Sequence, residues 1–320
     1  MSRGKILCAL VTMILATGFT LHAQPNAGFT EYGLQSGNPA PLCITLGPDG
    51  AAWFVEILGN KIGRIATDGV ITEFPLPTPN SYPRGITVGP DGAIWFGEMY
   101  NNKIGRITMD GMITEYSVPT TDSNPRSIVA GPDGAMWFTE NMGNKIGRMA
   151  LDGTFKEKSL PHPSSGVEHI VSGPDGALWF TEEDGNRIGR ITTRGVITEF
   201  TVPTRGSRPD VMTVGPDGAM WFSENRGNKI GRITTSGKFT EYPIPTASSD
   251  PAGITTGPDG ALWFTEFMTN KIGRITISDG QITEWLVPTV RSMPANIVTG
   301  ADGALWFAER LANKIGRFQP

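Results

Sequence analysis

The chain has 320 residues and a formal net charge of −4. Its 27 lysines and arginines are spread evenly along the sequence, which argues against a nucleic-acid-binding surface. Of its two cysteines, Cys8 falls in an apolar N-terminal run, which leaves Cys43 without a partner for an internal disulfide.

The first 23 residues have the pattern of a secretory signal peptide. Arg3 and Lys5 precede an apolar run over residues 6–21, and Ala23 offers a small residue at a cleavage point. The run is short for a membrane span, and no second apolar run follows it. We therefore expect a secreted or periplasmic protein without a membrane span, in which residues 24–320 form a single domain.

An internal repeat dominates the rest of the sequence. The motif W-F-x-E occurs seven times, with five successive spacings of 42 residues and one of 43. The seven tryptophans are Trp53, Trp95, Trp137, Trp179, Trp221, Trp263 and Trp306. Repeats of this length, with turn residues at regular intervals, are typical of β-propellers.

The second repeat shows how each unit divides. Its turn residues separate four short β-rich runs, RGITV, AIWFGE, KIGRIT and MITEY. The connections between these runs are GPDG, MYNN and MDG. This order predicts an antiparallel four-stranded blade.

The two ends of the chain supply complementary strands. Residues 28–32, GFTEY, match the fourth strand of a repeat, and residues 314–318, KIGRF, match a third strand. The last blade therefore lacks its outer strand unless the N-terminal segment provides it. Pairing the ends would close the ring and cover an open edge. We predict an all-β, closed seven-bladed propeller.

Residues that recur in every repeat are interpreted as scaffold. The seven W-F-x-E glutamates are Glu56, Glu98, Glu140, Glu182, Glu224, Glu266 and Glu309. In the expected strand register Glu56 faces Lys61 and Trp53 faces Arg64, which predicts a cross-strand ion pair and a cation–π contact in each blade. Phe54 faces Gly63, and the asparagine of N-K-I-G-R is expected to hold the connection through backbone hydrogen bonds.

Function is expected where the repeats differ. The residue after each repeat's proline begins the inner strand and faces the mouth of the central channel. These positions, eleven residues before each tryptophan, are Leu42, Arg84, Arg126, Glu168, Asp210, Ala252 and Ala295. Because blades follow one another around the ring, we expect a basic, an acidic and an apolar arc.

The turns between the second and third strands vary in the same way. They contribute Tyr100, Glu183, Asp184, Arg226, Phe267 and Leu311. Charges of both signs beside an apolar wall favour a small zwitterionic or peptide-like ligand. The alternative interpretation is that these are solvated rim charges that pair among themselves.

The repeat GPDGALWFTE…GNKIGRIT resembles the virginiamycin B lyase, or streptogramin B lyase, family over residues 28–318. The resemblance implies a seven-bladed propeller that confers antibiotic resistance by opening cyclic depsipeptides. It further implies a carbon–oxygen lyase: an Mg²⁺-assisted elimination at the ester, with a histidine as general base.

The site residues implied by this resemblance are only partly present. The family has histidine after the proline in the sixth and seventh repeats, where this chain has Ala252 and Ala295. A metal-binding glutamate of the family corresponds here to Met293. The other metal-binding glutamate is present as Glu309, a residue type that every repeat shares at that position.

His169 is the one histidine within a repeat and the remaining candidate for a general base. It lies one residue beyond Glu168, and strand alternation would turn it to the opposite face. We therefore interpret it as packed between blades or hydrogen-bonded at the rim. His162 lies on a loop and is expected to be exposed.

Carboxylates offer a second possible chemistry. Glu168, Glu182, Glu183, Asp184 and Asp210 are expected on one side of the mouth, and such clusters suit Mg²⁺ or Ca²⁺. Calcium-dependent lactonase and esterase propellers hold a cation at this place, although the match to them is one of architecture only.

Two functional hypotheses follow. In the first, the protein is an exported, monomeric propeller that binds a small molecule or peptide and has lost the lyase base. In the second, it is an enzyme, either a lyase with another base or a carboxylate–metal hydrolase.

Overall fold

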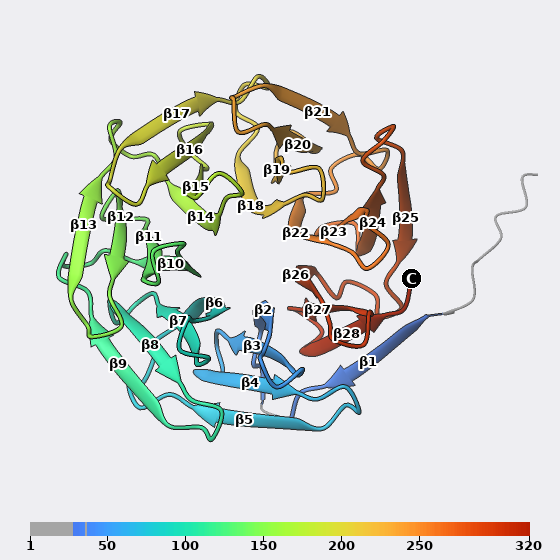
Figure 1. Cartoon of the computed structure of the whole chain (residues 1–320). Helices are drawn as coiled ribbons and strands as arrows, with labels where there is room; N and C mark the ends of the chain where they lie inside the picture. Colours follow the sequence, from blue (N-terminus) through green and yellow to red (C-terminus); the bar gives the residue numbers. More distant parts are fainter. Residues whose placement is uncertain (1–27, 36) are drawn as a thin grey trace, which may run out of the picture.

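The computed structural model describes residues 28–35 and 37–320 as a ring of seven four-stranded antiparallel sheets around a central axis (Figure 1). This confirms the predicted seven-bladed propeller. The described residues form no helix long and apolar enough to cross a membrane. The predicted signal peptide, residues 1–23, lies outside the described part of the chain.

The first four blades are built in chain order from the inside of the ring outward. The first blade contains β2 (Pro41–Leu46), β3 (Ala52–Glu56), β4 (Lys61–Ile65) and β5 (Ile71–Pro75). The second contains β6 (Pro83–Val88), β7 (Ile94–Glu98), β8 (Lys103–Ile107) and β9 (Ile113–Ser117). The third contains β10 (Pro125–Ala130), β11 (Met136–Glu140), β12 (Lys145–Met149) and β13 (Phe155–Ser159). The fourth contains β14 (Val167–Ser172), β15 (Ala177–Glu182), β16 (Arg187–Thr192) and β17 (Ile197–Thr201).

The last three blades repeat this order, with one exception at the end. The fifth contains β18 (Pro209–Val214), β19 (Met220–Glu224), β20 (Lys229–Ile233) and β21 (Phe239–Pro243). The sixth contains β22 (Pro251–Thr256), β23 (Leu262–Glu266), β24 (Lys271–Ile275) and β25 (Ile282–Leu286). The seventh contains β26 (Pro294–Thr299), β27 (Leu305–Glu309), β28 (Lys314–Phe318) and, as its outer strand, β1 (Phe29–Gly33).

The N-terminal strand closes the ring as predicted. β1 pairs antiparallel with β28, with Phe29 opposite Phe318. The two rings stack with their centroids 4.4 Å apart. Lys314 Nζ donates to Glu31 Oε2 at 2.8 Å, so the seam is held by an ion pair as well as by the strand ladder. In Figure 1, β1 lies along the outside of β28 at the junction between the last and first blades.

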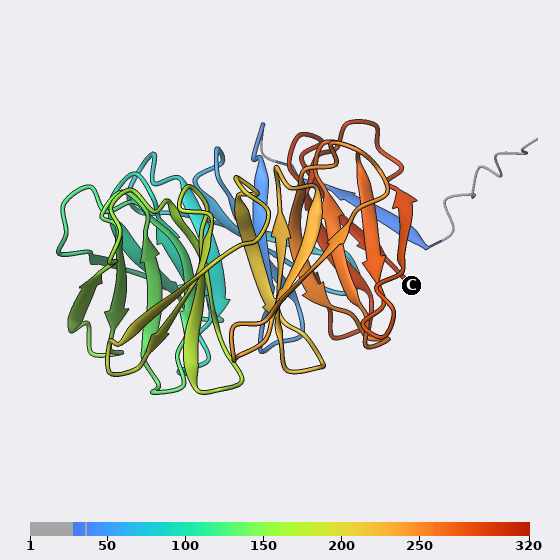
Figure 2. The same cartoon turned by 90° about the horizontal axis from the view of Figure 1, so that it is seen from above.

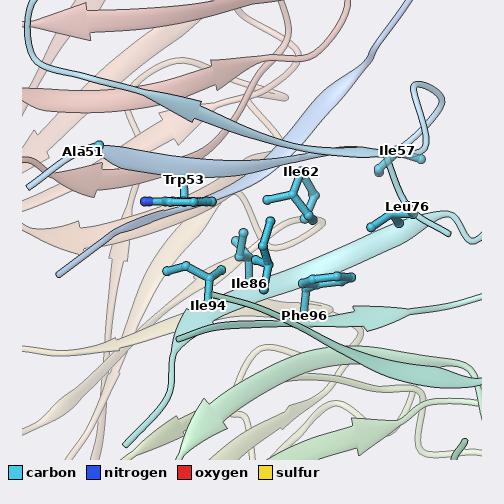
Figure 3. Close-up of a cluster of buried hydrophobic side chains, with 10 residues drawn as sticks. Ala51, Trp53, Ile57, Ile62, Leu76, Ile86, Ile94 and Phe96 are labelled. Atoms are coloured by element: carbon cyan, nitrogen blue, oxygen red, sulfur yellow. The ribbon is translucent and has the colours of Figure 1, made fainter. Parts of the chain in front are cut away.

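The core lies between the blades, where one sheet packs face to face on the next. Trp53 and Ile62 of the first blade pack against Ile86, Ile94 and Phe96 of the second (Figure 3). Four of these five side chains are fully buried, and the fifth is 9 % exposed. Because both faces of the second strand are covered, apolar residues follow one another without polar alternation.

The predicted register within each blade is confirmed. Phe54 faces Gly63, and a Cβ atom on Gly63 would lie 2.2 Å from the ring, so only glycine fits beneath it. Arg106 lies over the Trp95 ring, 5.7 Å from its centroid. Cation–π contacts of this kind occur in six blades, from the second to the seventh.

The aspartate of the GPDG turn binds two side chains of its blade, in addition to its predicted place in a tight turn. Asp91 Oδ1 accepts a hydrogen bond from Trp95 Nε1 at 2.9 Å, and Asp91 Oδ2 accepts one from Arg106 Nε at 2.7 Å. The same pair of bonds recurs in the other blades. Each turn therefore fixes the orientation of the indole that packs against the neighbouring blade.

The predicted ion pair between the repeated glutamate and lysine is wrong in most blades. Lys103 Nζ instead binds Glu115 Oε2 at 2.6 Å and the Thr78 hydroxyl at 2.7 Å. The lysine side chain runs toward the outer strand, where it has two acceptors and partial access to water. The fourth blade differs because arginine replaces lysine, and Arg187 Nη1 reaches Glu182 Oε2 at 3.3 Å.

The W-F-x-E glutamates are consequently buried carboxyl groups, and Glu140 is fully buried. Burial, followed by the negative charge of Glu157, raises the pKa of Glu140 to about 8. Desolvation likewise raises the pKa of Glu98 and of Glu224 to about 7. The folded protein thus retains protons that the unfolded chain releases near pH 4.5, the ordinary pKa of a glutamate.

This difference predicts how stability depends on pH. Because the folded state binds more protons, the free energy of unfolding falls as pH rises from the ordinary glutamate pKa through about 8. We expect the free energy of unfolding of Glu140→Gln, measured by urea unfolding, to fall less than that of the wild type between about pH 5 and about pH 8. The control variant Asp152→Asn, at an exposed turn, should lose as much free energy of unfolding over this pH range as the wild type does. Equal slopes for Glu140→Gln and the wild type would contradict the assignment.

Candidate ligand-binding site at the channel mouth

One face of the propeller is organised by the connections that lead into the inner strands. Before Pro83, both Asn80 and Tyr82 have left-handed backbones, each with φ of 56°. The Tyr82 carbonyl accepts a hydrogen bond from Met99 N at 3.4 Å, which ties the connection to the turn between β7 and β8. We call this side, which carries both sets of loops, the mouth face; Figure 2 shows the loops at both ends of the blades.

The repeated asparagine holds these connections through backbone hydrogen bonds, as predicted. Its partners lie in the connection to the next blade rather than in its own turn. Asn60 Nδ2 donates to the Thr78 carbonyl at 3.0 Å, and Asn60 Oδ1 accepts from Ser81 N at 2.7 Å. A residue in one blade therefore positions the chain entering the next. The start of each inner strand is fixed by its neighbour.

A β-bulge lies at the start of every inner strand. In the fourth blade Val167 faces Glu182 and Ile170 faces Phe180, so the inner strand has one extra residue. The extra residue breaks the alternation of side chains, and both Glu168 and His169 line the central pocket. The His169 ring reaches the inner strand of the fifth blade, as expected for a side chain packed between blades.

The seven positions predicted to face the channel do so, and we call them the mouth ring. The mouth ring consists of Leu42, Arg84, Arg126, Glu168, Asp210, Ala252 and Ala295. With the residues that follow them, they enclose a cavity of about 200 Å³ on the propeller axis. Ile86, Ile128 and Ile170 of the inner strands also border the cavity, while their side chains belong to the apolar clusters between blades.

The basic residues of the second and third blades are ion-paired with the acidic residue of the fourth. Arg84 Nη2 donates to Glu168 Oε1, and Arg126 Nη1 donates to Glu168 Oε2 at 2.5 Å. Arg126 Nε also donates to Asn124 Oδ1 at 2.9 Å. The ion pairing among these charges is the part of the alternative interpretation that the structure bears out. The side chain of Glu168 is only 6 % exposed, so these are not the solvated pairs of the alternative interpretation.

Burial opposes ionisation of Glu168, but the two guanidiniums outweigh it and hold the pKa of Glu168 below its ordinary value. The carboxylate accordingly stays charged between its two cations. The Arg84–Glu168 pair joins the second blade to the fourth and covers one side of the mouth.

Asp210, in the adjacent fifth blade, has a different environment. Its Oδ2 accepts one hydrogen bond, from Asn225 Nδ2 at 3.3 Å. Burial and the negative charge of Glu168 raise the pKa of Asp210 to about 7, although Arg84 acts in the opposite direction. Asp210 is therefore a carboxyl group without a cation hydrogen-bonded to it among the described residues.

The histidines have structural surroundings. His169 Nδ1 accepts a hydrogen bond from Met212 N at 3.3 Å and so links the inner strands of the fourth and fifth blades. Burial lowers the pKa of His169 to about 4, which leaves the ring neutral. His162 is exposed on its loop, as expected, with Nδ1 2.5 Å from Glu199 Oε2.

The other predicted metal ligands do not converge. Glu183 Oε1 pairs with Arg208 Nη2 at 2.6 Å, while Asp184 is mostly exposed. Glu182 pairs with Arg187 behind the pocket. Over residues 28–35 and 37–320, no three His, Cys, Asp or Glu side chains lie close enough together to hold a metal ion.

The turns between second and third strands surround the mouth with exposed side chains, which we call the rim. Tyr100, Leu311 and Arg226 lie there as predicted, whereas Phe267 is half-buried. Tyr100 stacks on Tyr82 with ring centroids 4.4 Å apart.

Sequence reasoning missed three rim residues, Leu58, Met142 and Met268, which occupy the same turn position as Tyr100. The five apolar rim residues are between 50 % and 72 % exposed: Leu58, Tyr100, Met142, Met268 and Leu311. Their common offset, five residues after each tryptophan, is a signal that could have found them.

The positions implied for the lyase base and metal are occupied by side chains that do not fit those roles. Ala252 and Ala295 present methyl groups in the mouth ring, and Met293 has a left-handed backbone with φ of 53°. Glu309 is buried at the end of β27 with neither carboxylate oxygen hydrogen-bonded, but the same holds for Glu98. Of the two glutamates that the resemblance implies as magnesium ligands, this chain thus keeps only Glu309. Its surroundings are like those of the equivalent glutamate Glu98.

Comparison with known proteins extends over the whole propeller. The family model described as "Virginiamycin B lyase family" matches residues 14–209 and 149–320. Selenomethionine-substituted virginiamycin B lyase from Staphylococcus aureus is 46 % identical, with a TM-score of 0.87, over 91 % of this chain and 99 % of the other. Among curated proteins, no match was found.

Two further structures are informative. A catalytically inactive histidine-to-alanine variant of virginiamycin B lyase from Staphylococcus aureus, with quinupristin, is 45 % identical, with a TM-score of 0.88, over 91 % of this chain and 99 % of that one. The WD40 β-propeller domain of Doa1 is 13 % identical, with a TM-score of 0.72, over 90 % of this chain and 96 % of that one. The last likeness is one of fold alone.

The pairing of Glu168 predicts a measurable effect on its neighbour. In Glu168→Gln the negative charge that raises the pKa of Asp210 is gone, so we expect the pKa of Asp210 to fall below about 7. Carbon-13 NMR titration of the aspartate carboxyls, assigned with Asp210→Asn, would measure it. Asp184→Asn serves as a control and should leave the midpoint in place. An unchanged midpoint in Glu168→Gln would refute the coupling.

Proposed function

Because the chain belongs to the virginiamycin B lyase family, we propose that it is an exported binding protein that keeps the lyase scaffold without the family's general base. The observation that carries the proposal is the pair Ala252 and Ala295 in the mouth ring. An elimination needs a group that removes the α-proton, and a methyl group cannot accept one.

His169 does not replace the base in this proposal. It lies in the fourth blade, away from the sixth and seventh, where the family places its histidines. Its Nδ1 is already an acceptor for Met212 N, which links two blades. Recruiting it for proton transfer would break that link.

Binding is supported by the shape and chemistry of the mouth. The cavity combines charged groups from the second to fifth blades with the apolar Leu42, Ala252 and Ala295. A concave site with a few converging polar groups on apolar walls suits a small molecule or a peptide. The complex of a related lyase with quinupristin makes a streptogramin B the first ligand to test.

One observation favours a second candidate function, a lyase-like enzyme with a different base. Asp210 is a carboxyl group in the pocket whose pKa is raised to about 7. A base that titrates near neutral pH is well suited to abstract a proton. In that case Asp210 would take the role of the missing histidine.

The two candidates differ in what happens to a streptogramin B. We expect quinupristin to bind the purified protein, by isothermal titration calorimetry, and to remain cyclic with Mg²⁺ present, by mass spectrometry. The Staphylococcus aureus virginiamycin B lyase is the positive control for ring opening. Ring opening by this protein that is lost in Asp210→Asn would establish the second candidate and exclude the first.

Export is the part of the proposal carried by residues 1–23. We expect the protein recovered from its host to lack this segment and to begin near Gln24, because the apolar run ends in a small-residue cleavage site. The intact mass of the protein from the cell envelope or culture fluid would measure it. Recovery of the full-length chain from the cytoplasm would contradict export.

A further inference from the structure

The two carboxylates of the mouth ring are unequally paired. Glu168 binds two guanidiniums, whereas Asp210 binds only the Asn225 amide. Asp210 also lines the cavity, so its open side faces the space that a ligand would occupy. A buried carboxylate gains most from a charged hydrogen-bond donor, because such bonds are stronger than neutral ones. Among the described residues, therefore, no cation is hydrogen-bonded to Asp210.

The two arginines retain donors of their own. Arg84 uses Nη2 for Glu168, and Arg126 uses Nη1 for Glu168 and Nε for Asn124. Both arginines line the same cavity as Asp210. Because Glu168 already supplies their anion, a neutral carbonyl oxygen is a sufficient partner for these donors.

The size of the cavity limits what enters it. Its volume is about 200 Å³, which corresponds to roughly seven water molecules at about 30 Å³ each. A single amino-acid residue is of this size. Leu42, Ala252 and Ala295 form the apolar wall that its side chain would contact.

The rim indicates that the ligand continues outside the cavity. Five of the seven turns carry an exposed apolar side chain at one common position. Isolated exposed apolar residues need no explanation, but five around one pocket form a surface for a larger partner. An extended peptide leaving the mouth would cross this surface.

We propose that the mouth binds the amino terminus of a peptide with an apolar first residue. The α-ammonium group donates to Asp210, and the first carbonyl oxygens accept from Arg84 and Arg126. The first side chain packs against Leu42, Ala252 and Ala295, and the following residues lie on the rim. This inference rests on the proposed binding function and names its ligand class.

A carboxyl terminus fits the same site less well. Its carboxylate would compete with Glu168 for the arginines and would leave Asp210 facing a second negative charge. Like charges at close range in a pocket are unfavourable. The ion pairs already present in the mouth ring thus favour the positively charged amino terminus of a peptide over its carboxyl terminus.

The test uses the full purified chain and a pentapeptide that begins with leucine and ends in a C-terminal amide. Calorimetry would compare it with its N-acetylated form and with the same peptide ending in a free carboxylate. We expect acetylation to weaken binding at least about tenfold, since it removes the charge that Asp210 binds. We expect the free carboxylate to bind no more tightly than the amide.

Two variants attribute the effect to the site. In Asp210→Asn the acetylated and free peptides should bind with affinities within about twofold, whereas Asp184→Asn, outside the cavity, should keep the full discrimination. If Asp210→Asn fails to fold, the comparison of the free and acetylated peptides on the wild-type protein still tests the proposal. Equal binding of both peptides to the wild type, no binding of either, or tighter binding of the free carboxylate would overturn the proposal.

Calorimetry and mass spectrometry with quinupristin, carried out in parallel, distinguish failure of this inference from failure of the proposed binding function. Binding of quinupristin without ring opening, together with no discrimination among the peptides, would reject the amino-terminus site and leave the binding function intact. Ring opening of quinupristin would reject the binding function, while the peptide comparison would still decide whether Asp210 recognises an ammonium group.

Discussion

The packing of each blade on the next is the constraint on which the rest of this structure depends. The second strand of every blade is covered on both faces, so Trp53 and Phe54, although adjacent, are both fully buried. The ring can stay this tight because Gly63 leaves room for the phenylalanine and the GPDG aspartate orients the tryptophan. Seven copies of this arrangement make a rigid wall, and the loops on the wall can vary without loss of the fold.

The same closeness shapes the mouth. The asparagine of one blade holds the chain that enters the next, and a bulge follows at the start of the inner strand. His169 and Glu168 illustrate the result: one links two blades through Met212, and the other joins two arginines across the mouth.

The charges of the mouth then acquire their properties from one another. Glu168 is held ionised by Arg84 and Arg126, and its charge in turn contributes to the raised pKa of Asp210. Three blades therefore set the chemistry of a residue in a fourth. The two alanines of the sixth and seventh blades leave the opposite side apolar. This division, rather than any single residue, is why we interpret the mouth as a binding site.

The sequence by itself determined the fold, because the 42-residue period, the turn residues and the complementary ends are local signals repeated seven times. It also placed the mouth ring, since a position in one repeat has the same place in all. It predicted the contacts that follow from strand register, such as Phe54 with Gly63, but not the partners of the long charged side chains. Lys103 faces Glu98 in the register but binds Glu115, and Arg84 reaches Glu168 two blades away. Lys103 and Glu115 lie diagonally on the adjacent strands β8 and β9 of one blade, whereas Arg84 and Glu168 are 84 residues apart and meet only because the blades close into a ring.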